Sequence, residues 1–214
     1  MAHMTFDEYL VTWSTLHSNA QPSLLVRCWL RVAFFVSTPF VRFGPNSVTV
    51  MGVIFMSVVV AISPDSPAIA AVCLPVVGLL DNIDGIVAVR SSRVSAYGAF
   101  LDSIADRIID ILSVAIFVRL GAHVYFGICA LMTTVIHEYM RARALSLGAK
   151  DVGVISIAEK PTRIIVTAIG LVAVAVLGDH RTNVSDYVLY LWCTIGVIGL
   201  LQLWPALKKQ LVNN

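Results

Sequence analysis

The chain has 214 residues, of which 58% are hydrophobic and only 13% are charged. Soluble domains carry about 25% charged residues, so this composition excludes an ordinary soluble domain and indicates an all-α, polytopic membrane protein. The formal net charge of +2 does not indicate a basic surface for binding nucleic acid. The four scattered cysteines predict neither a zinc site nor a disulfide framework.

The segment 1–43 is expected to combine a tag remnant with a juxtamembrane helix. Its first residues, MAHM, look like the remnant of an expression tag. Residues 22–43 place apolar side chains almost all round a helix, with Arg27 and Arg31 four positions apart. This pattern favours an interfacial helix on the cytoplasmic leaflet, with its arginines near lipid phosphates. A seventh, short or re-entrant membrane segment is the alternative.

Residues 44–214 are predicted to form one domain of six transmembrane helices, because each spanning helix needs about 20 mostly apolar residues. The connections between the apolar runs are short, which indicates antiparallel neighbours. In chain order the predicted spans are Ser47–Ile62, Pro67–Val89, Tyr97–Leu120, His123–Met140, Ile164–Leu177 and Tyr187–Leu203.

The basic residues predict the orientation of these spans. With six spans both termini lie on one side of the membrane, and the positive-inside rule makes the basic side cytoplasmic. The other side holds only Arg119 and Arg181. The cytoplasmic side holds Arg27, Arg31, Arg42, Arg90, Arg93, Arg141, Arg143, Lys150, Lys160, Arg163, Lys208 and Lys209.

Four aspartates lie where the second and third spans approach the cytoplasm. Asp81 and Asp84 are three apart, and Asp102 and Asp106 are four apart; residues at these spacings share a helix face. Because a short loop joins the two spans, the four carboxylates can meet, where they would repel one another and be costly to desolvate. Bound divalent cations would remove both penalties. Oxygen-only ligands suit magnesium, manganese or calcium, and two ions fit the ligand number.

Small residues accompany the acids. Gly85 and Ala88 follow Asp84 on the same face, and Gly98 lies one turn before Asp102. Small side chains let a ligand or another backbone approach closely, but helix packing in membranes uses them as well. For any single glycine, packing is the simpler interpretation.

The spacing D-x2-D-G-x2-A followed by G-x3-D-x3-D resembles the signature of the CDP-alcohol phosphotransferase family. The family pattern has arginine directly after the alanine, whereas this chain has Val89 there and Arg90 one position later. A shift of one position turns a side chain by about 100° around the helix axis. Arg90 therefore points in another direction than the arginine of the family pattern, which puts its role in doubt. The matching positions are Asp81, Asp84, Gly85, Ala88, Gly98, Asp102 and Asp106.

The resemblance extends over nearly all of residues 44–206. GPNSVT at 44–49 is similar to the start of the first membrane helix in many members, and residues 138–163 resemble actinobacterial phosphatidylinositol-phosphate synthases. The resemblance implies six membrane helices, a cleft facing the cytoplasm, an N-terminal interfacial helix and a homodimer in the cytoplasmic membrane.

The resemblance also implies an activity. Members transfer the phosphoryl group of a CDP-linked lipid or alcohol, such as CDP-diacylglycerol, to the hydroxyl of a small alcohol and release CMP. Inositol phosphate and glycerol 3-phosphate are both compatible acceptors. Two Mg²⁺ or Mn²⁺ ions are implied, held by Asp81, Asp84, Asp102 and Asp106, with Asp106 also the catalytic general base. The implied nucleotide-binding residues are Asn46, Thr49, Gly85, Ala88 and Gly98.

Basic residues around the fourth and fifth spans are candidates for binding the phosphate of the acceptor, since arginine grips phosphate with two donors. Positive-inside bias alone is the competing explanation. These candidates are Arg141, Arg143, Lys160 and Arg163. Nearby, His137 and Glu138 are expected to make hydrogen bonds within the bundle, and Asp110 is expected to pair with Arg107. The alternative for all three is a supporting role behind the residues that contact the metals or the substrate.

Two other functions stay open. A cation transporter would also hold aspartates inside the membrane, but it would place them near the midplane and along several helices. A catalytically silent family member is the other alternative, and Val89 keeps it open. Release of CMP in the presence of candidate alcohols distinguishes an active transferase from a transporter and from a silent family member.

Overall fold

The computed structural model describes residues 4–16, 21–149 and 156–212, and within these ranges every regular element is a helix. The predicted all-α class is confirmed. Residues 1–3 of the expected tag remnant, and Lys150, lie outside the described residues.

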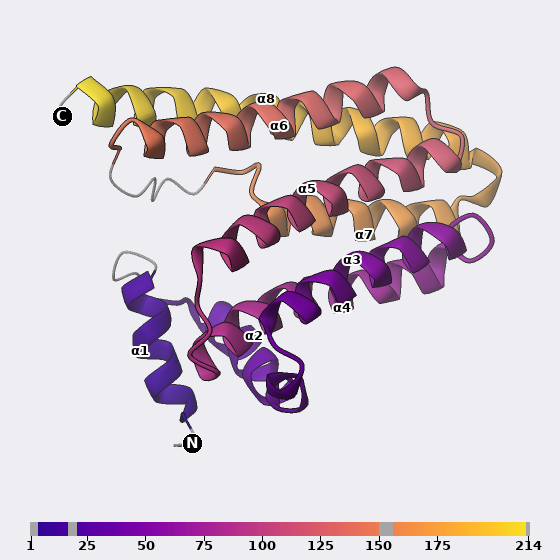
Figure 1. The fold of residues 1–214 in the computed structure, drawn as a ribbon. Helices are drawn as coiled ribbons and strands as arrows, with labels where there is room; N and C mark the ends of the chain where they lie inside the picture. The colour runs from indigo at the N-terminus through magenta and orange to yellow at the C-terminus, as the bar shows by residue number, and fades with distance from the viewer. Residues whose placement is uncertain (1–3, 17–20, 150–155, 213–214) are drawn as a thin grey trace. The chain divides into compact units, whose positions relative to one another are not determined.

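Figure 1 shows the helices in chain order. In the described ranges they are α1 (Phe6–Leu16), α2 (Leu24–Val36), η1 (Thr38–Arg42), α3 (Pro45–Ile62), α4 (Pro67–Arg90), α5 (Ala96–Arg119), α6 (Val124–Ser146), α7 (Lys160–Val176), η2 (Gly178–His180) and α8 (Arg181–Val212), where η marks a 3₁₀ helix.

Three of the six predicted spans coincide with helices that are long and apolar enough to cross a membrane. They are α3, α4 and the stretch Gly178–Val212, which contains α8. The other three spans coincide with α5, α6 and α7. Helix α7 has 17 residues, and α5 carries three aspartates in its first 15 positions, which lowers its hydropathy. The structure therefore describes a helical membrane protein with three clear candidate spans.

The chain divides into two compact units. Unit 1 comprises Met1–Phe55 and Val76–Asp106, and unit 2 comprises Met56–Pro75 and Arg107–Asn214. Helices α3, α4 and α5 each contribute residues to both units.

Helix α1 in unit 1 is an element that the sequence analysis missed. Its start is a capping box, in which the Thr5 backbone N–H donates to the Glu8 carboxylate (2.7 Å) and the Glu8 N–H donates to the Thr5 hydroxyl (3.3 Å). These hydrogen bonds lower the pKa of Glu8. Helix α1 packs on α2 through Tyr9 and Phe34, whose ring centroids lie 5.6 Å apart, and burial raises the pKa of Tyr9 to about 12.

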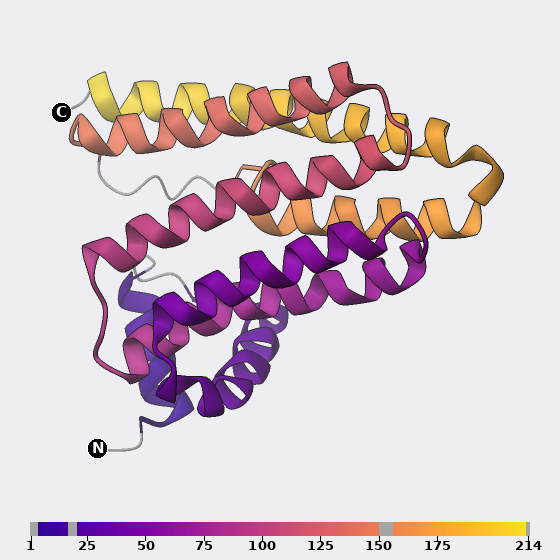
Figure 2. The same ribbon diagram turned by 45° about the vertical axis from the view of Figure 1, so that its right-hand side comes forward.

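The antiparallel pair α3 and α4 supplies the framework of unit 1 (Figure 2). Proline opens both helices, at the position where its missing N–H costs nothing. Val48 of α3 packs with three residues of α4, Leu80, Ile83 and Val87, in a buried cluster. This packing fixes the end of α4 that carries Asp81 and Asp84 against the beginning of α3.

In unit 2, α6 and α8 lie side by side in both views, and α7 also packs on α8 (Figures 1 and 2). Ala144 and Leu203 belong to the buried cluster between α6 and α8. Gly170 of α7 allows a close approach, because a Cβ there would lie 2.8 Å from both Phe117 and Val188. Such contacts between small and large residues are typical of helices packed in membranes.

Candidate active site

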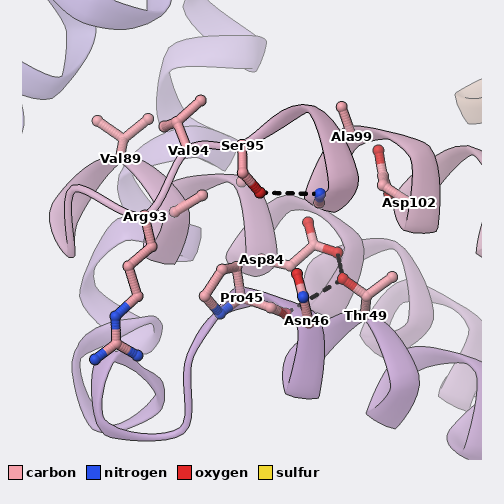
Figure 3. Close-up of a pocket in the computed structure, with 13 residues that line it drawn as sticks. Pro45, Asn46, Thr49, Asp84, Val89, Arg93, Val94, Ser95, Ala99 and Asp102 are labelled. Atoms are coloured by element: carbon pink, nitrogen blue, oxygen red, sulfur yellow. Dashed lines mark hydrogen bonds between the residues drawn. The ribbon is translucent and has the colours of Figure 1, made fainter.

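A cavity of about 220 Å³ opens in unit 1 where the start of α3, the end of α4 and the start of α5 meet (Figure 3). Ligand pockets usually measure about 300–1,000 Å³, so this cavity suits part of a substrate rather than a whole lipid. It is lined by Pro45, Asn46, Thr49, Asp84, Gly85, Ala88, Val89, Arg93, Val94, Ser95, Gly98, Ala99 and Asp102.

Three of the four predicted metal ligands form one group. Asp81, Asp102 and Asp106 each offer a carboxylate oxygen, and these oxygens all lie within 4.8 Å of one another. All three side chains are partly exposed. The α4–α5 connection brings the two helices together, as the sequence pattern predicted. An oxygen-only donor set of this kind fits a hard divalent cation such as Mg²⁺ or Mn²⁺.

Asp84 is more buried than the other three, with 7% of its surface exposed. Its Oδ2 accepts a hydrogen bond of 2.6 Å from the hydroxyl of Thr49 on α3. It lies within electrostatic reach of Asp81 and Asp102, and with Asp102 it lines the cavity. Asp84 can therefore add a fourth carboxylate to the group, in an orientation that Thr49 fixes.

The predicted nucleotide-binding residues all line this cavity. A Cβ added at Gly85 would meet nothing within 4 Å, so at this position the missing side chain leaves open space rather than a packing contact. A Cβ at Gly98 would lie 3.2 Å from Ser95 Oγ and 3.4 Å from Asn46 Oδ1. Packing is therefore a weak explanation for Gly85, but a good one for Gly98.

The departure at Val89 and Arg90 has a structural explanation. Val89 lines the cavity on one side and packs against the apolar cluster of α1 and α2 on the other. Arg90 turns toward the junction of α2 and η1, where its Nη1 donates to the Phe34 carbonyl (3.0 Å) and the Ser37 hydroxyl (2.7 Å). Its guanidinium also lies 4.4 Å from the centroid of the Phe34 ring. Arg90 anchors α2 to α4 and does not line the cavity.

In unit 2, the predicted acceptor residue Arg163 lies in a buried ion-pair cluster. Its Nε donates to Asp110 Oδ1 (2.9 Å), and its Nη1 donates to the Ala158 carbonyl (2.6 Å) and lies 3.5 Å from Glu138. Arg107 Nη2 lies 3.2 Å from Asp110 Oδ2, so the expected pair of Asp110 with Arg107 is confirmed. Arg163 Nη2 is buried and makes no hydrogen bond to any described residue.

The other three acceptor candidates differ in their surroundings. Arg141 Nη1 donates hydrogen bonds to both carboxylate oxygens of Glu159, at 2.7 and 2.8 Å. Arg143 is exposed near the end of α6, and Lys160 begins α7. A hydrogen bond of 2.7 Å joins His137 Nε2 to the Ser156 hydroxyl, as expected for a hydrogen-bonded residue of the bundle.

Sequence reasoning missed two polar residues of the cavity, Arg93 and Ser95. Ser95 Oγ accepts the Gly98 backbone N–H at 3.0 Å (Figure 3), which is the pattern of a helix N-cap residue. A serine three residues before a glycine at a helix start was a usable signal. No comparable signal pointed to Arg93, because its direction depends on how α4 ends.

Comparison with known proteins places these features in one family. The profile of the CDP-alcohol phosphatidyltransferase family matches residues 42–200. The archaetidylinositol phosphate synthase of Methanothermobacter thermautotrophicus is 38% identical over 143 residues, which cover 64% of this chain and 71% of that protein. The archaetidylinositol phosphate synthase of Aeropyrum pernix is 32% identical over 130 residues, covering 61% and 67%.

A solved structure has the same fold. The crystal structure of the phosphatidylinositol phosphate synthase of Mycobacterium tuberculosis with CDP-DAG bound matches with a TM-score of 0.66 and 21% identity. The match covers 83% of this chain and 94% of that chain. The resemblance inferred from the aspartate signature is thus confirmed by sequence and by fold.

Proposed function

The chain belongs to the CDP-alcohol phosphatidyltransferase family, and we propose that it transfers the phosphatidyl group of CDP-diacylglycerol to a hydroxyl of inositol phosphate, releasing CMP. Two relatives bear the name archaetidylinositol phosphate synthase, and the structural neighbour has CDP-DAG bound. The observation that carries the proposal is the group formed by Asp81, Asp102 and Asp106, with Asp84 and Asp102 lining the adjoining cavity.

The carboxylates of this group would hold two Mg²⁺ or Mn²⁺ ions, with Asp81, Asp84 and Asp102 as ligands and Asp106 beside them. When bound, such ions neutralise the pyrophosphate and stabilise the departing phosphate. The hydrogen bond from Thr49 holds the Asp84 carboxylate in one orientation. Partners of this kind orient metal ligands and strengthen binding.

The proposed reaction makes one P–O bond and breaks another. An acceptor hydroxyl oxygen attacks the phosphorus that carries the diacylglycerol, and the bond from this phosphorus to the oxygen of CMP breaks. The proton of the attacking hydroxyl passes to Asp106, the proposed general base. Asp106 suits this role because it lies in the group with Asp81 and Asp102, where a carboxylate oxygen can reach a hydroxyl beside the reacting phosphate.

The nucleotide is proposed to occupy the cavity along Gly85, Ala88 and Gly98, with Asn46 and Thr49 on the α3 side. The open space at Gly85 supports this assignment, since any larger side chain would project into the cavity.

The acceptor phosphate is proposed to bind Arg141, Arg143, Lys160 and Arg163. The buried Nη2 of Arg163 supports the assignment, because it is a donor without a hydrogen bond to any described residue. Buried donors are normally satisfied, and a phosphate oxygen would satisfy this one. Glu159 and Asp110 would then hold Arg141 and Arg163 in place.

In the membrane, we propose that α3 to α8 provide six spans with both termini in the cytoplasm, and that the protein is a homodimer. Helix α2 is proposed to lie in the cytoplasmic interface. Its exposed apolar residues support this placement, with Leu24 77% and Leu25 83% exposed, and Arg27 lies on the same helix.

The test is release of CMP by the purified protein in lipid, with CDP-diacylglycerol, Mg²⁺ or Mn²⁺, and a panel of inositol phosphate, glycerol 3-phosphate and unphosphorylated alcohols. We expect release that depends on inositol phosphate and is lost in Asp102→Asn and Asp106→Asn. Release that persists in these variants would contradict the roles proposed for the two aspartates. An absence of release with every alcohol would favour the silent or transporter alternatives.

A further inference from the structure

Arg93 is the only positively charged side chain among the described residues that line the cavity. It lies in the connection between α4 and α5, and it is exposed. In Figure 3 its side chain extends beside Pro45, away from Asp84 and Asp102. The cavity therefore has carboxylates at one end and a guanidinium at the other.

The end of α4 determines the place of Arg93. The Arg93 N–H donates to the Ala88 carbonyl (2.9 Å) and the Ser92 N–H donates to the Val89 carbonyl (3.1 Å). With Ser92 in the left-handed region at φ 56°, these two hydrogen bonds form a Schellman C-cap. Glycine is the usual residue at the position of Ser92, so the turn keeps a strained conformation directly before Arg93.

A second backbone feature makes room for the guanidinium. Gly44, directly before α3, has φ +86°, and a Cβ there would lie 3.1 Å from Arg93 Nη1. Two connections, one before α3 and one after α4, thus adopt left-handed conformations around a single arginine. This arrangement sets the Arg93 backbone and brings its guanidinium close to Gly44.

Small and apolar residues form much of the remaining lining of the cavity. Gly85, Ala88 and Ala99 contribute little volume, and Val89 and Val94 add apolar surface. A largely apolar lining with a few polar groups suits a flat ring with hydrogen-bonding atoms on its edge. If the metal-bound pyrophosphate lies at the carboxylate end, the group that reaches Arg93 is the base of the nucleotide.

We propose that Arg93 determines the specificity for cytosine, with its guanidinium donating hydrogen bonds to O2 and N3 of the base. This inference rests on the proposed function. Guanidinium only donates, and its planar fork fits two neighbouring acceptors. Cytosine offers two such acceptors, whereas uracil carries a hydrogen on N3 that would face the guanidinium.

The test compares the binding of CDP and UDP to the purified protein with Mg²⁺ by isothermal titration calorimetry. We expect the wild type to favour CDP. In Arg93→Gln the CDP affinity should fall by about tenfold, the scale for loss of a charge-assisted hydrogen bond, and the preference over UDP should disappear. Arg93→Lys keeps the charge but loses the fork, so it should lose the preference too. Arg27→Gln, an exposed change on α2, is the matched control and should leave both affinities unchanged.

The outcomes separate this inference from the proposed function. If Arg93→Gln weakens CDP and UDP equally while Arg93→Lys restores both, the arginine acts on the phosphates by charge and the inference is wrong. It is also wrong if the wild type releases CMP but the Arg93 variants keep the preference for CDP. A wild type that binds CDP over UDP through Arg93 but releases no CMP would contradict the proposed function alone. A wild type that neither binds CDP nor releases CMP would overturn both.

Discussion

Thr49 and Asp84, 35 positions apart in the sequence, are joined by a hydrogen bond of 2.6 Å from the threonine hydroxyl to the carboxylate. Both side chains are buried, with 7% of each residue exposed. Thr49 was predicted to bind the nucleotide, and the structure also gives it a contact that orients a proposed metal ligand. The pair therefore links the α3 wall of the cavity to the aspartates of α4.

Thr49→Val should lower the apparent affinity for Mg²⁺ by about 10- to 100-fold, the usual effect of removing a partner of a metal ligand. The reason is that Asp84 loses the donor that fixes its orientation. The measurement is CMP release as a function of Mg²⁺ concentration. Thr49→Ser keeps the hydroxyl and should retain most of the affinity. Equal Mg²⁺ dependence in the wild type and Thr49→Val would show that this hydrogen bond does not support the metal site.

Gly85→Val should impair binding of the CDP-linked substrate without unfolding the protein. The new side chain would project into open space in the cavity, and valine is tolerated in helices at least as well as glycine. We expect a higher KM for CDP-diacylglycerol and an unchanged thermal unfolding midpoint in detergent.

Gly170→Val is the matched control for this change. Its Cβ would lie 2.8 Å from Phe117 and Val188, and overpacking of this kind costs about 1–3 kcal/mol. It should lower the unfolding midpoint. A lowered midpoint in Gly85→Val with an unaltered KM would instead mean that Gly85 serves packing.

Asp110→Asn should destabilise unit 2 strongly. Asp110 is 4% exposed and lies 2.9 Å from Arg163 and 3.2 Å from Arg107, so the change leaves buried guanidinium groups without this counter-charge. Loss of one partner in a buried ion pair costs about 3–5 kcal/mol. The measurement is the free energy of unfolding in detergent, with Asp7→Asn as the control. Asp7 lies 3.8 Å from Arg27 and both side chains are exposed, so the cost there should be about 1 kcal/mol or less. Similar costs at both positions would contradict this assignment.

Arg90→Gln should loosen α2 while leaving the choice between CDP and UDP unaltered. Arg90 donates to Phe34 and Ser37, and it lies over the Phe34 ring. We expect faster hydrogen exchange of the α2 amides, measured by mass spectrometry. Exchange at wild-type rates, together with a lost preference for CDP, would assign Arg90 to the nucleotide instead.

The sequence predicted most of the helices because its apolar runs and its helix-breaking residues indicate the same boundaries. Helices α4 and α5 begin and end within one residue of the predicted spans. Helix α8 runs on to Val212, because backbone hydrogen bonds continue past the apolar run that sets a hydropathy boundary. Helix α1 was missed because its composition is mixed, although Thr5 and Glu8 have the capping-box spacing.

The candidate site was predictable where chemistry follows spacing along one or two neighbouring helices. Asp81, Asp102 and Asp106 come together because two antiparallel helices share a short connection. The contact of Thr49 with Asp84 depends on how α3 packs on α4, and the place of Arg93 depends on the left-handed turn at Ser92. Tertiary packing and turn geometry determine these two features, so they cannot be predicted from the spacing of residues along a helix.

Titration of the protein with Mn²⁺, followed by electron paramagnetic resonance of the unbound ion, tests most directly whether these carboxylates form the metal centre. The wild type should remove Mn²⁺ from solution, and Asp7→Asn, a change on the exposed face of α1, should do the same. Asp102→Asn and Asp81→Asn, folded as judged by thermal unfolding, should leave the ion in solution at the same concentrations. Uptake of Mn²⁺ by these two variants equal to that of the wild type would contradict the account.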